Sequence, residues 1–284
     1  MKTFANILIT GASSGIGEAL ALYYAAHGAK HLFLSGRNVQ RLQEVREKCE
    51  KLGAHVDAQK IDVTNREQMA QWIGSCYAVA PLDAVFANAG VSTGEETAEN
   101  IYCTFETNVM GVINTVTPTV ELYRQNKGGA KTVVITASIA GYHGLSACPS
   151  YSASKACVKA YGEALRNQLR PEGIDVNVVC PGFVKSRITD KNTCPMPFFM
   201  SAEKAAEIIA TRIDKNVGYV ILILTFIFTT IRKPVPCNLI VKTVNKSLKL
   251  TIRKLCEVHG CFTLNSVYVL LETYATIHNF VTNI

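Results

Sequence analysis

The stretch Thr10-Gly11-Ala12-Ser13-Ser14-Gly15-Ile16-Gly17 is a glycine-rich turn around which the rest of the chain can be placed. Residues 4–9 before it are apolar and predict a strand, and the residues from Glu18 onward have helical periodicity. The order strand, glycine-rich turn, helix creates a phosphate site, because unpaired N–H groups and the positive end of the helix dipole face an anion. The alternative is a plain turn between a strand and a helix.

Each glycine of this turn has an expected role. Gly11 permits the tight turn, Gly15 lets a diphosphate approach the backbone, and Gly17 lets helix and strand pack closely. The predicted cofactor contacts in the turn are Gly11, Ser13, Ser14, Gly15, Ile16 and Gly17.

Strands and helices are predicted to alternate beyond the turn. Strands are expected at 31–35, 54–61, 82–87, 131–137, 174–180 and 218–224, and helices at 39–52, 66–77, 101–122, 151–169 and 202–213. This alternation predicts an α/β fold of the Rossmann type, a doubly wound parallel sheet of about seven strands with helices on both faces. Ligands of such sheets bind at the carboxyl ends of the strands.

Length and composition suit one α/β domain with an extension. The chain has 284 residues, of which 48% are hydrophobic, and we expect residues 1–231 to form the dinucleotide-binding domain and 232–284 an extension. The ten cysteines include no Cys-x-x-Cys pair, which predicts reduced thiols in the cytoplasm and no metal site. The start of the chain leaves no room for a cleavable signal peptide before the first strand.

The positive charge of the chain belongs to its tail. Residues 215–284 hold 8 Lys or Arg against 2 Asp or Glu, whereas residues 1–214 hold 21 against 20. No basic recognition element is apparent, so no nucleic-acid partner is expected. Residues 217–231 carry no charge but are too few to span a membrane. Residues 232–254 are either a basic amphipathic helix in peripheral contact with a membrane or a solvated face packed on the body.

The end of the second predicted strand bears on the choice of cofactor. An acidic residue usually holds the ribose 2′-hydroxyl of NAD at this place, but here the sequence reads Gly36-Arg37-Asn38. Arg37 therefore favours NADP over NAD, because a cation here can meet a 2′-phosphate. The alternative is that Arg37 is a solvated loop cation.

Tyr151 and Lys155 lie four residues apart and therefore on one face of a predicted helix. A phenol is a poor base at neutral pH, but a nearby ammonium group lowers its pKa. Tyr151 can then exchange a proton with a substrate oxygen while a hydride moves to or from a nicotinamide, and Ser138 can hydrogen-bond the same oxygen. By spacing alone, a Tyr and a Lys four apart are most often a surface pair.

These motifs together resemble the short-chain dehydrogenase/reductase family over about residues 3–190. They are Thr10-Gly-x-x-x-Gly-x-Gly17, Asn88-Ala-Gly90, Asn108, Ser138, Tyr151-x-x-x-Lys155 and Pro181-Gly182. The resemblance implies an NAD(P)-dependent oxidoreductase and a homodimer or homotetramer formed through helix faces.

The resemblance also implies roles for residues of this chain. Tyr151 is the acid/base, Lys155 also holds the nicotinamide ribose, Ser138 orients the substrate, and Asn108 supports a water relay to Lys155. The further cofactor-binding residues implied are Asp62, Val63, Asn88, Ala89, Gly90, Pro181, Gly182, Val184 and Ser186.

The sequence also departs from the family pattern. Ala87 precedes Asn88 where many members have a second asparagine, and Ser186 stands where threonine is common. The segment Cys194-Pro-Met-Pro-Phe-Phe-Met200 is apolar, so we expect a lid near residues 190–213 over an apolar carbonyl or alcohol substrate. The alternative is that this proline-rich loop only packs against the domain.

Three functions remain open from the sequence. The first is an NADP(H)-dependent enzyme that interconverts a carbonyl and a secondary alcohol. The second is a non-catalytic dinucleotide-binding sensor or scaffold on the same fold, and the third is a membrane-attached partner whose tail is the functional part.

Overall fold

The computed structural model describes residues 4–126, 128–191, 196 and 198–222. The chain divides into two compact units, residues 1–223 and 224–284. The second unit, the predicted boundary at residue 231 and the predicted amphipathic segment 232–254 lie outside the described residues.

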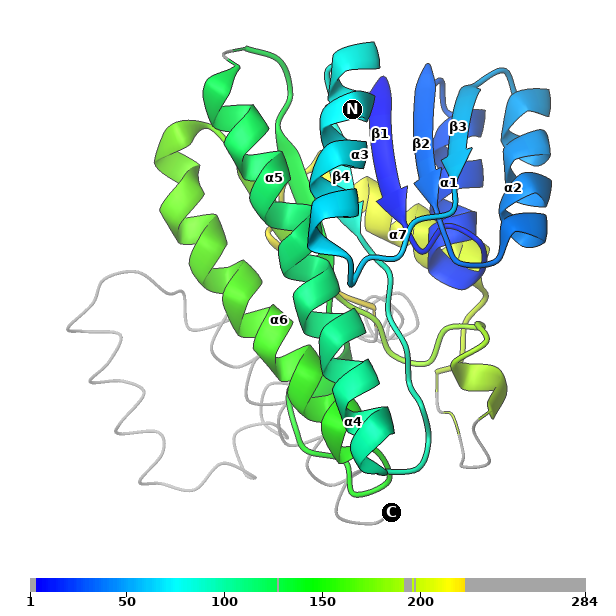
Figure 1. The fold of residues 1–284 in the computed structure, drawn as a ribbon, viewed down its shortest axis with the longest axis vertical. Coiled ribbons are helices and arrows are strands. Elements are labelled where there is room, and N and C mark those ends of the chain that lie inside the picture. The colour runs from blue at the N-terminus through cyan, green and yellow to red at the C-terminus, as the bar shows by residue number, and fades with distance from the viewer. Residues whose placement is uncertain (1–3, 127, 192–195, 197, 223–284) are drawn as a thin grey trace, which may run out of the picture. The chain divides into compact units, whose positions relative to one another are not determined.

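Seven strands alternate with helices along the first unit (Figure 1). The strands are β1 (Asn6–Thr10), β2 (His31–Ser35), β3 (His55–Gln59), β4 (Ala84–Ala87), β5 (Thr132–Thr136), β6 (Asp175–Cys180) and β7 (Tyr219–Ile221). The α-helices are α1 (Gly15–Ala26), α2 (Val39–Lys51), α3 (Arg66–Val79), α4 (Ala98–Phe105), α5 (Gly111–Gln125), α6 (Pro149–Leu169) and α7 (Ala202–Asp214). The short helices are η1 (Glu106–Met110, a π-turn), η2 (Ile139–Gly141), η3 (Arg170–Glu172) and η4 (Thr189–Lys191).

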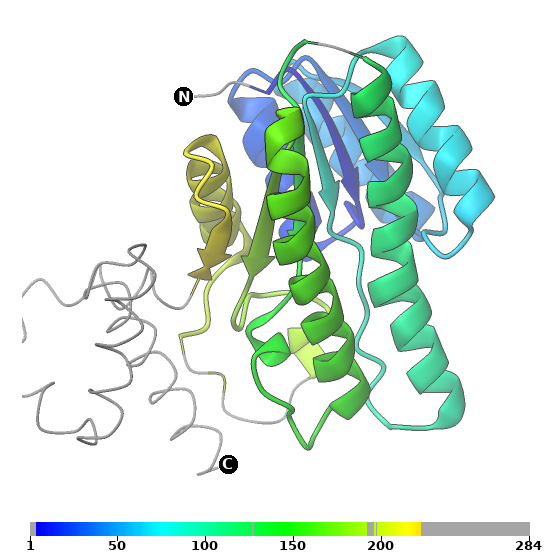
Figure 2. The ribbon, with the colours of Figure 1, turned by 90° about the vertical axis from the view of Figure 1, so that its left-hand side faces the viewer.

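The strands form one parallel sheet in the order β3-β2-β1-β4-β5-β6-β7. The chain winds outward from β1 to β3, then returns to β4 on the other side of β1 and winds to β7. This order confirms the predicted doubly wound sheet, and its switch point lies between the carboxyl ends of β1 and β4. Figure 2 shows the strand arrowheads pointing toward the end of the domain at which α6 begins.

Alternate residues of each strand face opposite layers of helices. In β1, Ile7 and Ile9 pack into the core beneath α1, α2 and α7, whereas Leu8 packs into the core beneath α3, α5 and α6. All three side chains are fully buried, as the two-residue period of a strand covered on both faces requires.

Helix ends are held by local polar contacts. The side chains of Asn38, Asn65, Thr97 and Ser201 each accept a hydrogen bond from the backbone N–H three residues later. The cap by Ser201 lies directly before the helix that the sequence predicts at 202–213.

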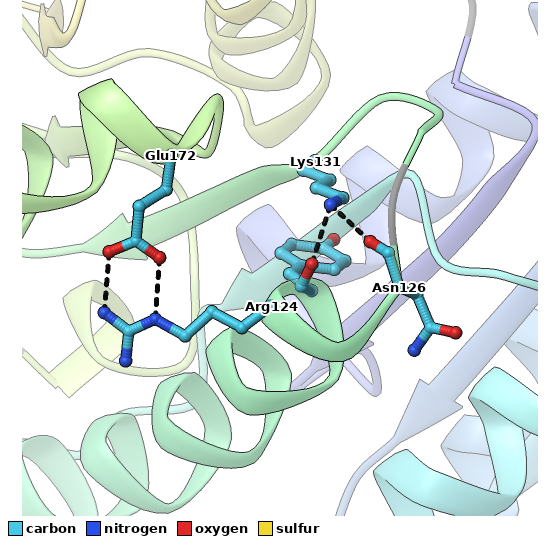
Figure 3. Close-up of polar contacts among 5 residues, drawn as sticks. Arg124, Asn126, Lys131 and Glu172 are labelled. Atoms are coloured by element: carbon cyan, nitrogen blue, oxygen red, sulfur yellow. Dashed lines mark hydrogen bonds and ion pairs between the residues drawn. The ribbon is translucent and has the colours of Figure 1, made fainter.

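The carboxyl-terminal end of α5 is held by two basic side chains (Figure 3). Lys131 donates to the backbone carbonyl groups of Tyr123 and Asn126, which have no partner within the helix. Arg124 donates two parallel hydrogen bonds to Glu172, at 2.7 and 2.8 Å, and so ties α5 to η3. The pair of Arg124 and Glu172 lies on the exposed surface of the domain, whereas the hydrogen bond from Lys131 to Tyr123 is partly buried.

Two features differ from the sequence-based expectations. The predicted helix 101–122 begins at Ala98, ends at Gln125 and is interrupted by the π-turn η1. Within the predicted lid region, α7 packs against α1 and buries Ala205 and Ile209 in the core, so this helix is a fixed layer. The part of the predicted lid that α7 does not occupy is the segment before Ser201. Residues 192–195 and 197 of this segment lie outside the described part of the chain.

The described residues also bear on the remaining composition-based expectations. Cys49, Cys76, Cys103, Cys157 and Cys180 are free thiols, and the described residues contain no cluster of His, Cys, Asp and Glu that could hold a metal ion. None of their helices has the length and apolar character needed to cross a membrane.

Candidate functional site

A cavity of about 580 Å³ lies along the carboxyl ends of the strands. It brings together nearly all of the predicted site residues: Gly11, Ser13, Ser14, Gly15, Ile16, Arg37, Asp62, Val63, Asn88, Ala89, Gly90, Ser138, Tyr151, Lys155, Pro181, Gly182, Val184 and Ser186. Gly17 and Asn108 are outside this lining, and both contact residues that belong to it. The switch point of the sheet is therefore hollow, as a ligand site requires.

The glycine loop has no room for side chains. Gly11 and Gly15 have positive φ angles, 68° and 61°, which favour glycine. A Cβ atom on Gly17 would lie 2.4 Å from the Gly11 carbonyl oxygen and 2.7 Å from Nδ2 of Asn88. A Cβ on Gly11 would lie 2.8 Å from the Cα of Ala89. The loop is thus packed tightly against the end of β4.

The start of α1 offers backbone donors to the cavity. Ser14 is the N-cap residue, but its side chain makes no capping hydrogen bond. The first N–H groups of a helix have no partner within the helix, and the positive end of the dipole lies at the same place. The amino terminus of α1 therefore suits an anion such as a diphosphate.

Hydrogen bonds across three central strands fix the floor of the cavity. Asn88 donates through Nδ2 to the Thr10 carbonyl oxygen at 3.1 Å and accepts from Oγ1 of Thr136 at 3.3 Å. The Thr10 hydroxyl accepts from the N–H groups of Asn88 and Ala89. These contacts tie the loop after β4 to the carboxyl ends of β1 and β5.

Lys155 is buried, with 3% of its surface exposed. Its Nζ donates to the Thr136 carbonyl oxygen at 2.9 Å and lies 5.8 Å from the centre of the Tyr151 ring. In the described parts of the chain no carboxylate forms an ion pair with it. Burial lowers the pKa of Lys155 to about 8.

Tyr151 and Ser138 line the cavity beside Lys155. Burial raises the pKa of the Tyr151 phenol, and a hydrogen bond with Ser138 opposes this effect. The Ser138 hydroxyl donates to the Pro181 carbonyl oxygen at 3.4 Å and accepts from the N–H of Ala140 at 3.2 Å. Ser138 thus links the Tyr151 phenol to the Pro181-Gly182 segment.

Asn108 lies in the π-turn η1 and is fully buried. Its Oδ1 accepts from the N–H of Val91 at 2.8 Å, and its Nδ2 donates to the Val91 carbonyl oxygen and to the Ser154 hydroxyl. A Cβ on Gly90 would lie 3.2 Å from Asn108 Oδ1 and 3.3 Å from Lys155 Nζ. The amide therefore ties the loop after β4 to the helix of Tyr151, while its part in a water relay stays a prediction.

A carboxylate fixes the amino-terminal end of α6, one residue before Tyr151. Glu96, in the loop after β4, accepts hydrogen bonds from the N–H and the hydroxyl of Ser150 at 3.0 and 2.8 Å. A Cβ on Gly141 would lie 2.8 Å from the backbone of Lys155, so η2 also packs directly against this helix. The position of α6 relative to the cavity is set by these contacts.

The far end of the cavity is lined by Arg37, Arg41 and Asp62. Arg41 is not predicted from the sequence, where it reads as one of several polar residues of α2. The buried Nε of Arg41 has no hydrogen-bond partner among the residues that the structure describes. This end thus combines two guanidinium groups with one carboxylate, and only the fold shows that Arg41 belongs to it.

The segment after β6 closes one wall. The Thr189 hydroxyl accepts from the N–H of Ser186 at 2.9 Å, and Val184 forms a β-bridge with Met200. The lining also contains residues for which the sequence offered no motif: Ser35, Gly36, Asn38, Ile61, Val91, Ser92, Thr107, Thr136, Ala137, Arg187, Ile188 and Thr189. Apart from Thr107, which lies in η1, they belong to the end of a strand or to the segment that follows it.

Comparisons with known proteins agree with this geometry. The family described as short chain dehydrogenase matches residues 5–195. An uncharacterized oxidoreductase of Myxococcus xanthus is 37% identical over 220 residues, which cover 75% of this chain and 85% of that protein. The 11-beta-hydroxysteroid dehydrogenase-like 4A protein of Arabidopsis thaliana is 32% identical over 191 residues, 65% of this chain and 62% of that protein.

Solved structures with the same fold contain dinucleotides. A short-chain dehydrogenase/reductase from Burkholderia phymatum in complex with NAD has a TM-score of 0.70 at 27% identity, covering 78% of this chain and 90% of that one. A short-chain dehydrogenase from Sphingobium yanoikuyae in complex with NADPH has a TM-score of 0.70 at 25% identity, covering 76% and 86%. The fold thus accommodates either dinucleotide.

A parallel Rossmann sheet whose switch-point cavity is lined by a serine, a tyrosine and a lysine is typical of a class of oxidoreductases. The chain belongs to the short-chain dehydrogenase/reductase family.

Proposed function

We propose that this chain is an NADP(H)-dependent oxidoreductase that interconverts a carbonyl group and a secondary alcohol, with Tyr151 as the acid/base. The observation that carries the proposal is the placement of Tyr151, Ser138 and Lys155 on one cavity whose other half is a glycine loop at a helix amino terminus. A protein that only binds dinucleotides has no need of an acid/base phenol such as Tyr151.

The residues present fit a nicotinamide dinucleotide. Gly11 and Gly15 expose the loop backbone to the cavity, and α1 offers uncapped N–H groups where a diphosphate would lie. Asp62 and Val63 would flank the adenine, and Lys155 would hold the nicotinamide ribose. Val184, Ser186 and the Pro181-Gly182 segment would hold the nicotinamide amide.

The reduction needs one hydride and one proton. A bound nicotinamide dinucleotide would supply the hydride. Ser138 holds the carbonyl oxygen by a hydrogen bond, and Tyr151 gives that oxygen the proton. The Lys155 ammonium stabilises the resulting phenolate, and Asn108 supports the path by which a proton returns to it. In the oxidation direction, the Tyr151 phenolate accepts the proton of the alcohol.

Selection of NADP(H) is the second part of the proposal. Arg37 and Arg41 line the end of the cavity that would hold the adenosine ribose, and a 2′-phosphate would complete the empty hydrogen-bonding capacity of Arg41. Among the described residues of the lining, Asp62 is the one carboxylate, and its side chain accepts from Thr64 rather than pointing to a sugar hydroxyl.

We also propose an apolar substrate, a homodimer or homotetramer and a cytoplasmic location, with peripheral membrane contact through residues 232–254. The exposed pair Phe198 and Phe199 beside the cavity wall supports an apolar substrate, as does the relative named after a steroid dehydrogenase.

The exposed apolar side chains of Tyr102 in α4 and Met110 in η1 support an oligomer, because a second copy of the chain would cover them. Sedimentation in solution tests the oligomer, and binding to anionic vesicles tests the membrane contact.

The test of the reaction is carbonyl-dependent oxidation of the reduced cofactor. The purified chain is incubated with NADPH or NADH and a panel of aldehydes and ketones of increasing apolar size, and absorbance of the reduced nicotinamide is followed. We expect consumption that requires the carbonyl and is faster with NADPH. Binding of the dinucleotide without turnover on any carbonyl or alcohol would favour the sensor or scaffold function instead.

A further inference from the structure

Arg187 is a cation of the cavity that neither the motifs nor the reaction uses. It follows Ser186 in the segment after β6, is exposed to solvent and lines the cavity. No described carboxylate lies within ion-pair distance of it. A guanidinium with five donors and no anionic partner in a cavity is suited to an anionic ligand.

The neighbours of Arg187 place it beside the glycine loop. A Cβ atom on Gly15 would lie 3.0 Å from the Cβ of Ser186 and 3.9 Å from the Lys185 carbonyl oxygen. The segment that carries Arg187 therefore crosses the amino terminus of α1. Arg187 and the first residues of α1 both line the cavity.

The other charges of the cavity are accounted for elsewhere. Arg37 and Arg41 line the end beyond β2, and Lys155 is bonded to β5 near Tyr151. Arg37 follows Gly36, which packs against the loop at Ser13, whereas the segment of Arg187 packs against it at Gly15, the first residue of α1.

We infer that Arg187 holds the diphosphate of the dinucleotide from the side opposite α1, so that the two phosphates lie between helix N–H groups and a guanidinium. This inference rests on the proposed function and adds a positioning residue to it. Because the diphosphate is common to NADP(H) and NAD(H), Arg187 increases the affinity for both cofactors equally. It does not affect the selection of one over the other.

Lys185 provides a matched control two residues away. It is also exposed, but it is absent from the cavity lining, and its charge acts on Glu203 at the start of α7, where it contributes to lowering the pKa of that carboxyl group. Removal of either cation changes the net charge equally, so only a local contact separates the two variants.

The experiment is a binding titration of wild type, Arg187→Ala, Arg187→Lys and Lys185→Ala. The ligands are NADPH, NADH, ADP-ribose and adenosine 2′-monophosphate. ADP-ribose has the diphosphate but neither the nicotinamide nor the 2′-phosphate, and adenosine 2′-monophosphate has no diphosphate. We expect Arg187→Ala to weaken NADPH, NADH and ADP-ribose by a common factor of about ten, the scale of one hydrogen bond to a charged group. Arg187→Lys restores part of this loss, Lys185→Ala changes nothing, and adenosine 2′-monophosphate binds all four proteins equally.

Two failures are distinguishable. If wild type binds dinucleotides and Arg187→Ala binds ADP-ribose as tightly as wild type does, the inference is overturned and the proposed function stands. If wild type binds neither NADPH nor NADH, the proposed function itself fails. An equal loss in Arg187→Ala and Lys185→Ala would show a general charge effect and would also overturn the inference.

Discussion

The two ends of the cavity are built differently. At the nicotinamide end, Lys155 and Asn108 are buried and hydrogen-bonded to the backbone of other elements. At the adenosine end, Arg37 lies in a loop and has no ion pair among the described residues, and Arg41 keeps an unpartnered Nε. The buried end is organised before any ligand arrives, whereas the cations of the other end lack partners until an anion binds.

This difference separates chemistry from selectivity. Proton transfer needs groups held at fixed positions, because misplacement by a fraction of an ångström weakens catalysis. Discrimination between two dinucleotides that differ by one phosphate needs only a charge at one place, which an exposed arginine provides. Substitutions at the two ends should therefore change different measurements.

Removal of the Tyr151 hydroxyl is expected to have the largest effect. Tyr151→Phe should lower kcat by about 10³-fold or more, because it deletes the proton donor and leaves the ring in place. The dissociation constants of NADPH and NADH should stay within about twofold of the wild-type values, since the glycine loop is untouched. Single-turnover kinetics with a reactive carbonyl and a parallel binding titration measure both, and unchanged turnover would contradict the acid/base role.

The buried ammonium predicts a pH dependence of stability. The pKa of Lys155 is about 8 in the fold and about 10.4 in an unfolded chain. Between these values the unfolded chain holds a proton that the folded chain lacks, so the free energy of unfolding rises with pH. Relative to Lys155→Met, the ligand-free wild type should gain about 2 kcal/mol between about pH 7 and about pH 9.5.

Urea denaturation of both proteins across this pH range measures the gain, because groups common to both proteins cancel in the difference. A constant difference would show that Lys155 keeps its ordinary pKa and that burial has not perturbed it.

At the adenosine end, Arg37→Ala should act on one cofactor only. We expect NADPH affinity to fall roughly 10- to 100-fold, the range for a charged hydrogen bond to phosphate, while NADH affinity is unchanged. Arg66→Ala, at the exposed start of α3, is the control that removes the same charge outside the cavity. An equal loss of NADH affinity would show that Arg37 acts only through the overall positive charge of the cavity. Unchanged affinity for both NADPH and NADH would show that Arg37 is a solvated loop cation.

The smallest effect is expected away from the cavity, at the exposed pair of Arg124 and Glu172 (Figure 3). Arg124→Ala should shift the urea midpoint only slightly and leave turnover unchanged. The hydrogen bond from Arg124 lowers the pKa of Glu172, so the stability it adds is present above the ordinary pKa of a glutamate and is lost as pH falls through the lowered value. A midpoint shift that persists at acid pH or in high salt would contradict this account.

Much of this protein was readable from local patterns. The seven strands, the doubly wound order and the positions of Gly11, Asn88, Tyr151 and Lys155 followed from periodicity and from motif spacing. These features are local in sequence, because a strand, a turn and the face of a helix each depend on residues a few positions apart. The resemblance to short-chain dehydrogenases supplied the roles.

Other features depend on interactions between distant parts of the chain. The π-turn at Asn108 has no sequence signature, and its amide is held by Val91 and Ser154 from two other elements. Arg41 and Arg187 read as ordinary surface cations until the sheet brings the ends of β2 and β6 to one cavity. The same holds for α7, which the prediction included in a lid near residues 190–213 and which packs against α1 as part of the core.

The sequence by itself thus determined the order of the elements and the reactive groups, since both are written in short-range patterns. The tertiary structure decided which groups are buried, and burial is what lowers the pKa of Lys155 and raises that of Tyr151. Desolvation depends on everything packed around a group and not on its neighbours in sequence. For that reason the raised pKa of Tyr151, opposite to the lowering that the sequence predicts, became visible only in the fold.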